Sequence, residues 1–128
     1  MKTKFEIEFL LKTSPRVLED KLTTPSGLGE WFADNVNANG NVYEFSWNGS
    51  KESAYLQHHK PGSKIRFKWV NDEDEETYFE MAYKQDSMTN IVALNIIDFA
   101  EDDEVDENKL VWQKNVTDLI RLLGAELS

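Results

Sequence analysis

Turn-forming residues recur at short intervals between residues 39 and 90, and this spacing constrains the fold more than any other feature of the sequence. The turn signals are Asn39-Gly40, Asn48-Gly49, Pro61-Gly62, the acidic run 72–76 and the segment 85–87. Asn-Gly pairs accept the positive φ angles of tight hairpin turns. The β-rich segments around them predict six strands, at residues 35–38, 42–48, 52–59, 63–70, 77–85 and 89–99. Because these connections are too short for crossover helices, we expect an antiparallel meander.

The N-terminal segment adds one strand and two short helices to this meander. Residues 4–12 alternate between apolar and polar side chains, which predicts a half-buried strand. Ser14-Pro15 then indicates a helix start, because a serine side chain caps the first amides and proline suits the first helical position. Thr24-Pro25 ends this helix and begins a second one. We expect the second helix to carry Leu28, Trp31 and Phe32.

Residues 105–123 predict a long amphipathic helix at the C-terminal end. Its apolar stripe recurs at helical spacing and consists of Val105, Trp112, Val116, Leu119, Ile120 and Leu123. Such a helix of about 20 residues is roughly 30 Å long, which is enough to cross a whole sheet. We therefore predict one α+β domain over residues 1–128. In this domain the C-terminal helix packs across a curved, seven-stranded antiparallel sheet, the helix-grip arrangement.

The composition argues against several classes of function. The chain has no cysteine, which excludes disulfides, thiolate catalysis and cysteine-based zinc sites. A net charge of -10 repels phosphate backbones, so we expect no nucleic-acid partner. There is no apolar run near the ~20 residues of a membrane span, and no export signal is visible. We expect no membrane insertion and a cytoplasmic location.

The motifs point to no catalytic or metal chemistry. The two histidines, His58 and His59, are adjacent on a predicted strand, so they point to opposite faces and cannot chelate one metal together. No G-x-S-x-G elbow and no phosphate-binding glycine loop occurs. We therefore expect no metal, no cofactor and no catalytic residue, which favours a protein that is not an enzyme.

The order of elements, the segment from Thr24-Pro25 to residues 30–34 (Glu-Trp-Phe-Ala-Asp) and the tryptophan in the last helix together resemble the START-like superfamily. Within this helix-grip, Bet v-like superfamily, the chain is similar to the branch of the heat-shock-protein-90 ATPase activator homologues. The resemblance implies a sheet wrapped around the last helix, often with a cavity for an apolar ligand. Members include lipid carriers, hormone receptors, polyketide cyclases and chaperone-associated proteins, so the resemblance does not select one function.

We expect the space between the last helix and the sheet to be the ligand site, if these side chains do not simply fill a packed core. The candidate lining residues are Trp31, Phe32, Tyr55, Phe67, Trp69, Phe79, Met81, Tyr83, Asn95, Trp112, Val116 and Ile120. Three of them, Tyr55, Tyr83 and Asn95, would orient a ligand through hydrogen bonds. The first hypothesis is thus non-enzymatic binding of a small apolar or amphipathic molecule.

Two alternatives stay open at this point. The last strand, 89–99, is apolar on both faces, so it is either covered on both sides or forms a homodimer contact. The chain would then be a protein–protein module, homodimeric or chaperone-associated, with a filled core and no ligand. The other alternative is an enzyme of the cyclase or hydratase kind.

Overall fold

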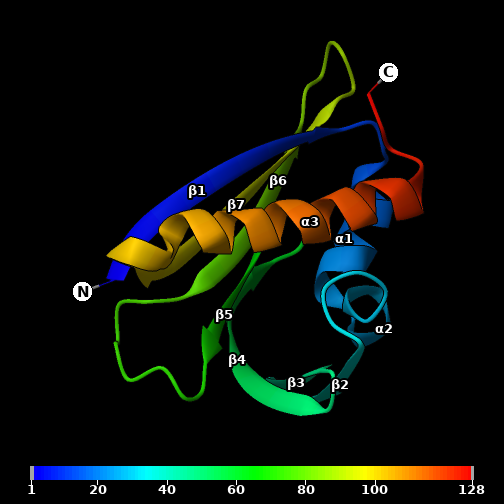
Figure 1. Ribbon diagram of the computed structural model, residues 1–128. Coiled ribbons are helices and arrows are strands. Elements are labelled where there is room, and N and C mark those ends of the chain that lie inside the picture. The colour runs from blue at the N-terminus through cyan, green and yellow to red at the C-terminus, as the bar shows by residue number, and fades with distance from the viewer. Residues whose placement is uncertain (1, 128) are drawn as a thin grey trace.

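The computed structural model describes residues 2–127, and it confirms the predicted order of elements. The elements are β1 (Lys2–Leu11), α1 (Pro15–Thr23), α2 (Pro25–Leu28), β2 (Asn35–Asn39), β3 (Val42–Trp47), β4 (Ser50–Lys60), β5 (Lys64–Trp69), β6 (Phe79–Gln85), β7 (Val92–Glu101), the 3-10 turn η1 (Asp102–Glu104) and α3 (Val105–Leu123). The strands of this part of the chain form one antiparallel sheet in the order β1-β7-β6-β5-β4-β3-β2. The sheet is strongly curved, and α3 lies across it at the β1–β7 side (Figure 1). This is the helix-grip fold.

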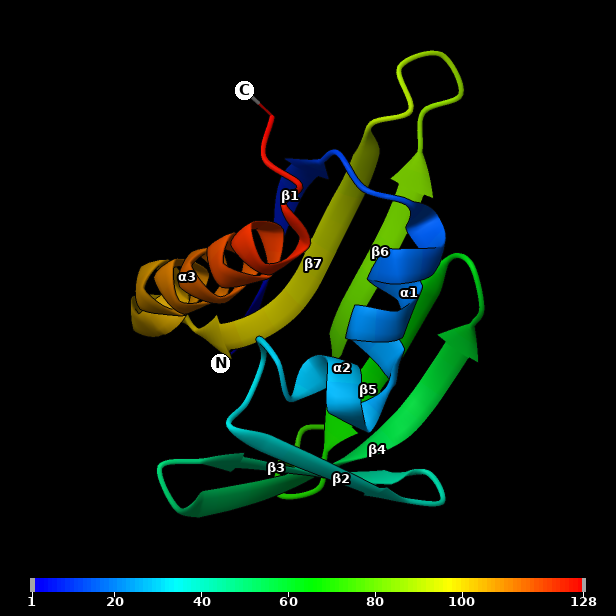
Figure 2. The same cartoon turned by 90° about the vertical axis from the view of Figure 1, so that its right-hand side faces the viewer.

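Helices α1 and α2 cover the part of the concave face that α3 leaves free (Figure 2). Ser14 accepts a hydrogen bond from the backbone N–H of Val17 at 3.2 Å, as expected of a helix cap. Thr24 caps α2 in the same way, accepting from Gly27 at 2.9 Å.

Helix α2 is shorter than the sequence predicted, and this part of the prediction was wrong. It ends at Leu28, so Trp31 and Phe32 lie in the turn that follows it. Glycines 27 and 29 disfavour a longer helix, because glycine loses more backbone entropy than other residues on helix formation. The turn is closed instead by a hydrogen bond from the Phe32 amide to the Leu28 carbonyl at 2.8 Å.

The hairpin turns follow the sequence signals. Asn48 and Gly49 both have positive φ angles, 49° and 86°, which match a tight turn between β3 and β4. Strand β4 contains one irregularity, a register shift between Leu56 and His58. Beyond it His58 pairs with Arg66 and His59 with Ile65, so the two histidines lie on opposite faces of the sheet.

The sheet has a buried inner face, toward the helices, and a polar outer face. The largest fully buried side chains of the inner face include Phe45, Phe67, Phe79, Met81 and Ile96. Helix α3 contributes Trp112, Val116 and Leu119 to the same core, and Ile120 packs partly buried against it. The amphipathic stripe predicted for this helix is therefore confirmed.

Strand β7 lies between β1 and β6, so both of its edges are paired. Val92, Leu94 and Ile96 face the core, whereas Ala93 and Ile97 lie half-buried on the outer face. A second copy of the chain therefore cannot pair with an edge of β7, and any contact through this strand would use its outer face.

None of the helices formed by residues 2–127 combines the length and the apolar character that crossing a bilayer requires.

Candidate functional site

The space between α3 and the sheet is filled at its centre by aromatic rings. Phe32 occupies the middle of this cluster and is 6% exposed. Its ring centroid lies 5.2–5.7 Å from those of Trp31, Phe45, Trp47, Phe79 and Trp112. The centre of the helix-grip is thus filled by the protein's own side chains.

An open cleft of about 420 Å³ lies beside this cluster, between α3 and the inner face of the sheet. It is lined by Phe32, Trp47, Glu52, Trp69, Asp98, Asn108, Val111, Trp112 and Asn115. We call it the aromatic cleft. Its volume falls within the range of small-molecule sites, roughly 300–1,000 Å³.

The tryptophans of the aromatic cleft come from three different elements. Trp47 ends β3, Trp69 ends β5 and Trp112 lies in α3. The ring centroids of Trp47 and Trp69 are 6.2 Å apart, and the ring of Trp69 lies tilted against Phe79 with the centroids 5.0 Å apart. The indole N–H of Trp47 donates to the Phe32 carbonyl at 2.9 Å. Among the described residues, no acceptor is found for the indole N–H of Trp69, which leaves this donor for a ligand or for water.

Asp98 is one of the two carboxylates that line the aromatic cleft. It follows Val92, Leu94 and Ile96 in the inward-facing alternation of β7. Its Oδ2 accepts from the indole N–H of Trp112 at 2.8 Å, and its Oδ1 accepts from the Phe99 amide at 2.7 Å. Burial raises the pKa of Asp98 to about 6, although both of these hydrogen bonds favour the charged form.

Asp98 was not among the predicted site residues, although the sequence contains a signal for it. The spacing Val92, Leu94, Ile96, Asp98, Ala100 places one carboxylate in an otherwise apolar series of inward positions. The apolar residues at the odd-numbered positions of the same strand obscured this alternation.

A second, polar cleft of about 560 Å³ adjoins the first, with which it shares Phe32, Trp47 and Asn115. Its charged lining residues are Glu30, Asp34, Lys114 and Asp118. Lys114 forms an ion pair with Asp118 at 3.8 Å, one turn further along α3. The two clefts form one groove along α3, with an aromatic part and an acidic part.

The predicted lining residues divide between the cleft, the core and the outer face. Phe32, Trp69 and Trp112 line the aromatic cleft. Phe67, Phe79, Met81 and Val116 are buried in the core, where Ile120 packs against them, and Trp31 lines the polar cleft.

Two of the predicted polar residues lie on the wrong face for the site. Tyr55 pairs with Lys68 and is 46% exposed, and Asn95 pairs with Glu8 on the outer face. Because neighbouring residues of a strand alternate between faces, neither side chain lines the space below α3. The sequence prediction of these two residues as ligand-orienting groups is corrected accordingly.

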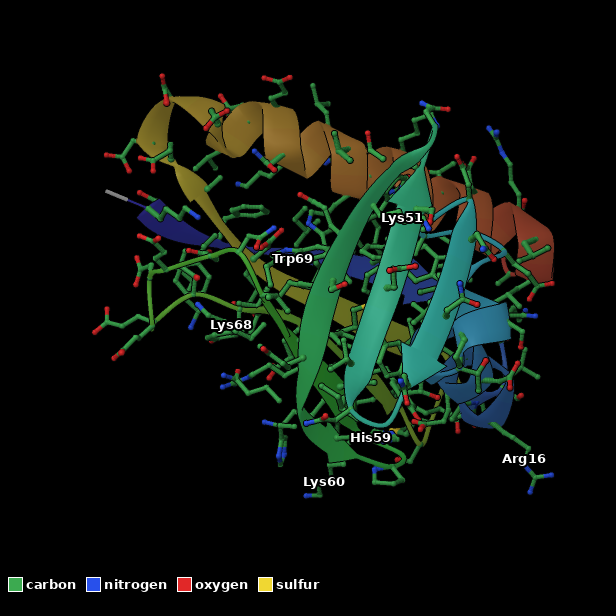
Figure 3. All side chains as sticks on the ribbon, turned by 90° about the horizontal axis from the view of Figure 1, so that it is seen from below. Arg16, Lys51, His59, Lys60, Lys68 and Trp69 are labelled. Carbon is green, nitrogen blue, oxygen red and sulfur yellow. The ribbon has the colours of Figure 1, made fainter. Side chains whose placement is uncertain are left out.

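Tyr83 faces inward but belongs to a polar cluster with Glu19 and His59. Figure 3 shows His59 at the opposite end of the β4–β5 hairpin from Trp69. The Tyr83 hydroxyl donates to Oε1 of Glu19, which also accepts from the Gly62 amide at 3.1 Å. His59 contacts the other oxygen of Glu19 at 2.9 Å. Burial would raise the pKa of Glu19, but the hydrogen bonds of Tyr83, His59 and Gly62 together lower it. The hydroxyl of Tyr83 therefore holds α1 against the sheet through its hydrogen bond to Glu19.

One further surface feature offers fewer groups for binding or catalysis. A depression of about 450 Å³ on the outer face is lined by Leu10, Lys84, Gln85, Asp86, Thr89, Ile91 and Ala93. It contains no aromatic ring and no buried charge. Within residues 2–127, no group of three or more His, Cys, Asp or Glu side chains is arranged to hold a metal ion.

Comparison with known proteins places the chain in a family. Residues 1–125 match the START-like superfamily domain. The chain therefore belongs to the START-like superfamily, as its sequence resemblance indicated. No curated protein matches the chain.

Among solved structures, the protein BfR322 of Bacteroides fragilis is 34% identical to this chain, covering 99% of it and 94% of its own length, with a TM-score of 0.70. The Aha1 dimer of Colwellia psychrerythraea is 17% identical, with a TM-score of 0.81 and coverage of 94% and 96%. DynU16, a protein in the dynemicin biosynthetic locus, is 16% identical, with a TM-score of 0.75 and coverage of 94% and 47%. The last two likenesses concern the fold alone.

Proposed function

We propose that this protein is a binding domain that holds a small apolar or amphipathic molecule in the aromatic cleft. The observation that carries the proposal is the arrangement of Trp47, Trp69 and Trp112 around an open space. Large aromatic side chains left partly exposed in a concave site, with a few polar groups among them, are typical of ligand sites. Covering this surface with a ligand would contribute ~25 cal/mol for each Å² of apolar area removed from water.

The proposal predicts that Trp69 contributes more to binding than an exposed aromatic residue on the outer face of the sheet. With the neutral fluorescent probe N-phenyl-1-naphthylamine, we expect an emission increase on binding. The variant Trp69→Ala should weaken that binding about tenfold, because one wall of the cleft is removed. Tyr55→Ala is the matched control, since Tyr55 lies on the outer face of the adjacent strand.

The folded state of both variants is checked by circular dichroism, and Trp69→Phe tests whether a smaller ring restores part of the affinity. An unchanged affinity in Trp69→Ala, or an equal loss in Tyr55→Ala, would show that the probe binds outside the aromatic cleft.

One observation favours a second candidate, an enzyme of the cyclase or hydratase kind. Asp98 sits in an apolar cleft with a pKa of about 6, so near neutral pH its carboxyl group can both accept and release a proton. Within hydrogen-bond reach of a bound molecule it would serve as a general acid or base. Turnover of a bound compound that stops in Asp98→Asn, while binding persists, is the result that would favour this candidate over a pure binding domain.

A protein–protein module is the third candidate, and it rests on the similar fold of the Aha1 dimer. A homodimer would have to cover the outer face of β7, where Ile97 is flanked by Glu6 and Glu80, and Ala93 by Leu10 and Lys84. Analytical ultracentrifugation tests this directly, because a monomer at high protein concentration would contradict it.

A further inference from the structure

We infer that the molecule held in the aromatic cleft is an organic cation, whose ammonium group lies against Asp98 and among the rings of Trp47, Trp69 and Trp112. This inference rests on the proposed function, because it names the chemical class of the ligand for the same cleft. It is carried by the charges, the hydrogen bonds and the rings of the described lining residues.

The charges of the groove are almost all negative. The aromatic cleft is lined by two carboxylates, Asp98 and Glu52, and none of the described residues lining it is Lys, Arg or His. The adjoining polar cleft adds Glu30, Asp34 and Asp118; Glu30 is paired with Lys21 and Asp118 with Lys114, so only Asp34 of these three lacks a cationic partner among the described residues. An anionic ligand would be repelled by the carboxylates of the aromatic cleft, whereas a cationic one would be attracted.

Asp98 lacks a cationic partner of its own. In the described part of the chain its hydrogen bonds come from two neutral donors, the Trp112 indole and the Phe99 amide. Lys2 acts on it only at longer range, because Lys2 is held by Asp72 at 2.9 Å. A largely buried carboxylate without a positive partner is unfavourable in free energy. An asparagine could accept the hydrogen bond from the Trp112 indole without that cost. The presence of a charged carboxylate at this position therefore favours a cationic ligand.

The aromatic rings of the cleft are the second feature that favours binding of a cation. The negative faces of aromatic rings attract cations within about 6 Å of the ring centroid, and tryptophan is the strongest of the three aromatic residues in this respect. Trp47 and Trp69 line the cleft from the sheet, while Trp112 lines it from α3 and also contacts Asp98. A quaternary or protonated amine with an apolar body would therefore meet rings on several sides and the carboxylate of Asp98.

The test compares two probes that have the same shape and differ in charge: benzyltrimethylammonium and its neutral carbon isostere neopentylbenzene. Binding is followed through the indole N–H signals of the four tryptophans in ¹⁵N–¹H NMR spectra of the intact protein. We expect the cation to shift the signals of Trp47, Trp69 and Trp112. Its Kd should be at least about tenfold lower than that of the neutral isostere.

Two variants separate a specific site from general attraction to an acidic protein. Asp98→Asn should abolish the preference for the cation, so that the two probes bind with similar affinity. Glu8→Gln removes the same charge from the outer face of β1, and it should keep the preference intact. A dispersed NMR spectrum of each variant confirms that it is folded.

The outcomes distinguish the inference from the function on which it rests. Equal affinity for the two probes, or a preference that survives in Asp98→Asn, overturns the inference while the cleft remains a site for apolar molecules. If neither probe shifts the three indole signals, both the inference and the proposed function fail.

Discussion

Asp98 has two hydrogen bonds that favour its charge, and yet burial raises the pKa of its carboxyl group to about 6 from an ordinary value of 3.8. The free-energy cost of removing the carboxylate from water is larger here than the gain from its two hydrogen bonds with neutral donors. Glu52 lies in the same cleft, and Lys2 and Asp72 act on Asp98 from β1 and the β5–β6 loop. A residue kept in an environment that disfavours its charge is typical of a functional site.

The raised pKa of Asp98 predicts a specific effect of pH on stability. Between about pH 4 and pH 6, Asp98 has lost its proton in the unfolded chain but still holds it in the folded protein. The contribution of Asp98 to the free energy of unfolding therefore falls as the pH rises. The loss is complete above the folded pKa and amounts to no more than about 3 kcal/mol. Asp98→Asn should therefore raise the melting temperature at pH 7–8 and have no such effect below pH 4.

Thermal unfolding at several pH values measures this difference, with Glu8→Gln as a control for the change in net charge. If Asp98→Asn were less stable than the wild-type protein at pH 8, the carboxylate would stabilise the fold. The interpretation of Asp98 as part of a functional site would then lose this support.

At the scale of elements, the packing of α1 against α2 depends on one glycine. A Cβ atom at Gly27 would lie 2.3 Å from the carbonyl oxygen of Asp20 and 2.8 Å from the Cα of Lys21, both of which belong to the backbone of α1. Backbone atoms cannot move aside as a flexible side chain does. The close approach of the two helices, and with it the position of Phe32 beyond α2, therefore requires glycine at this position.

We expect Gly27→Ala to lower the free energy of unfolding by about 2–3 kcal/mol, because α2 must shift away from α1. Gly29→Ala is the matched control, since the nearest atom to its Cβ would be 3.3 Å away and its φ angle of -69° suits alanine. Urea denaturation of the two variants provides the comparison. Equal stability would contradict the tight contact seen between the helices.

The elements themselves were largely predictable from the sequence, because turns and amphipathic periods are local signals. The Asn48-Gly49 turn and the stripe of α3 are of this kind. The candidate site was predictable only in part, since it depends on which face a residue occupies within a register set by distant strands. Tyr55 and Asn95 were assigned to the wrong face for this reason, and Asp98 was overlooked.

At the scale of the whole molecule, Phe32 determines what kind of site the fold can offer. Its ring fills the space at the centre of the helix-grip, so the enclosed cavity is replaced by an open groove along α3. That arrangement was not predictable from composition, because the same aromatic residues could have lined a cavity or filled it. The groove combines three tryptophans with an acidic extension, and these features are the basis of the function proposed for this member of a functionally diverse superfamily.

Intermolecular nuclear Overhauser effects between isotope-labelled protein and unlabelled N-phenyl-1-naphthylamine would locate the bound probe and so test directly whether the aromatic cleft is the binding site. We expect contacts from the probe to the side chains of Trp47, Trp69 and Trp112 in this cleft. Contacts to Leu10 and Ala93 in the outer depression instead, with none to these tryptophans, would contradict this expectation.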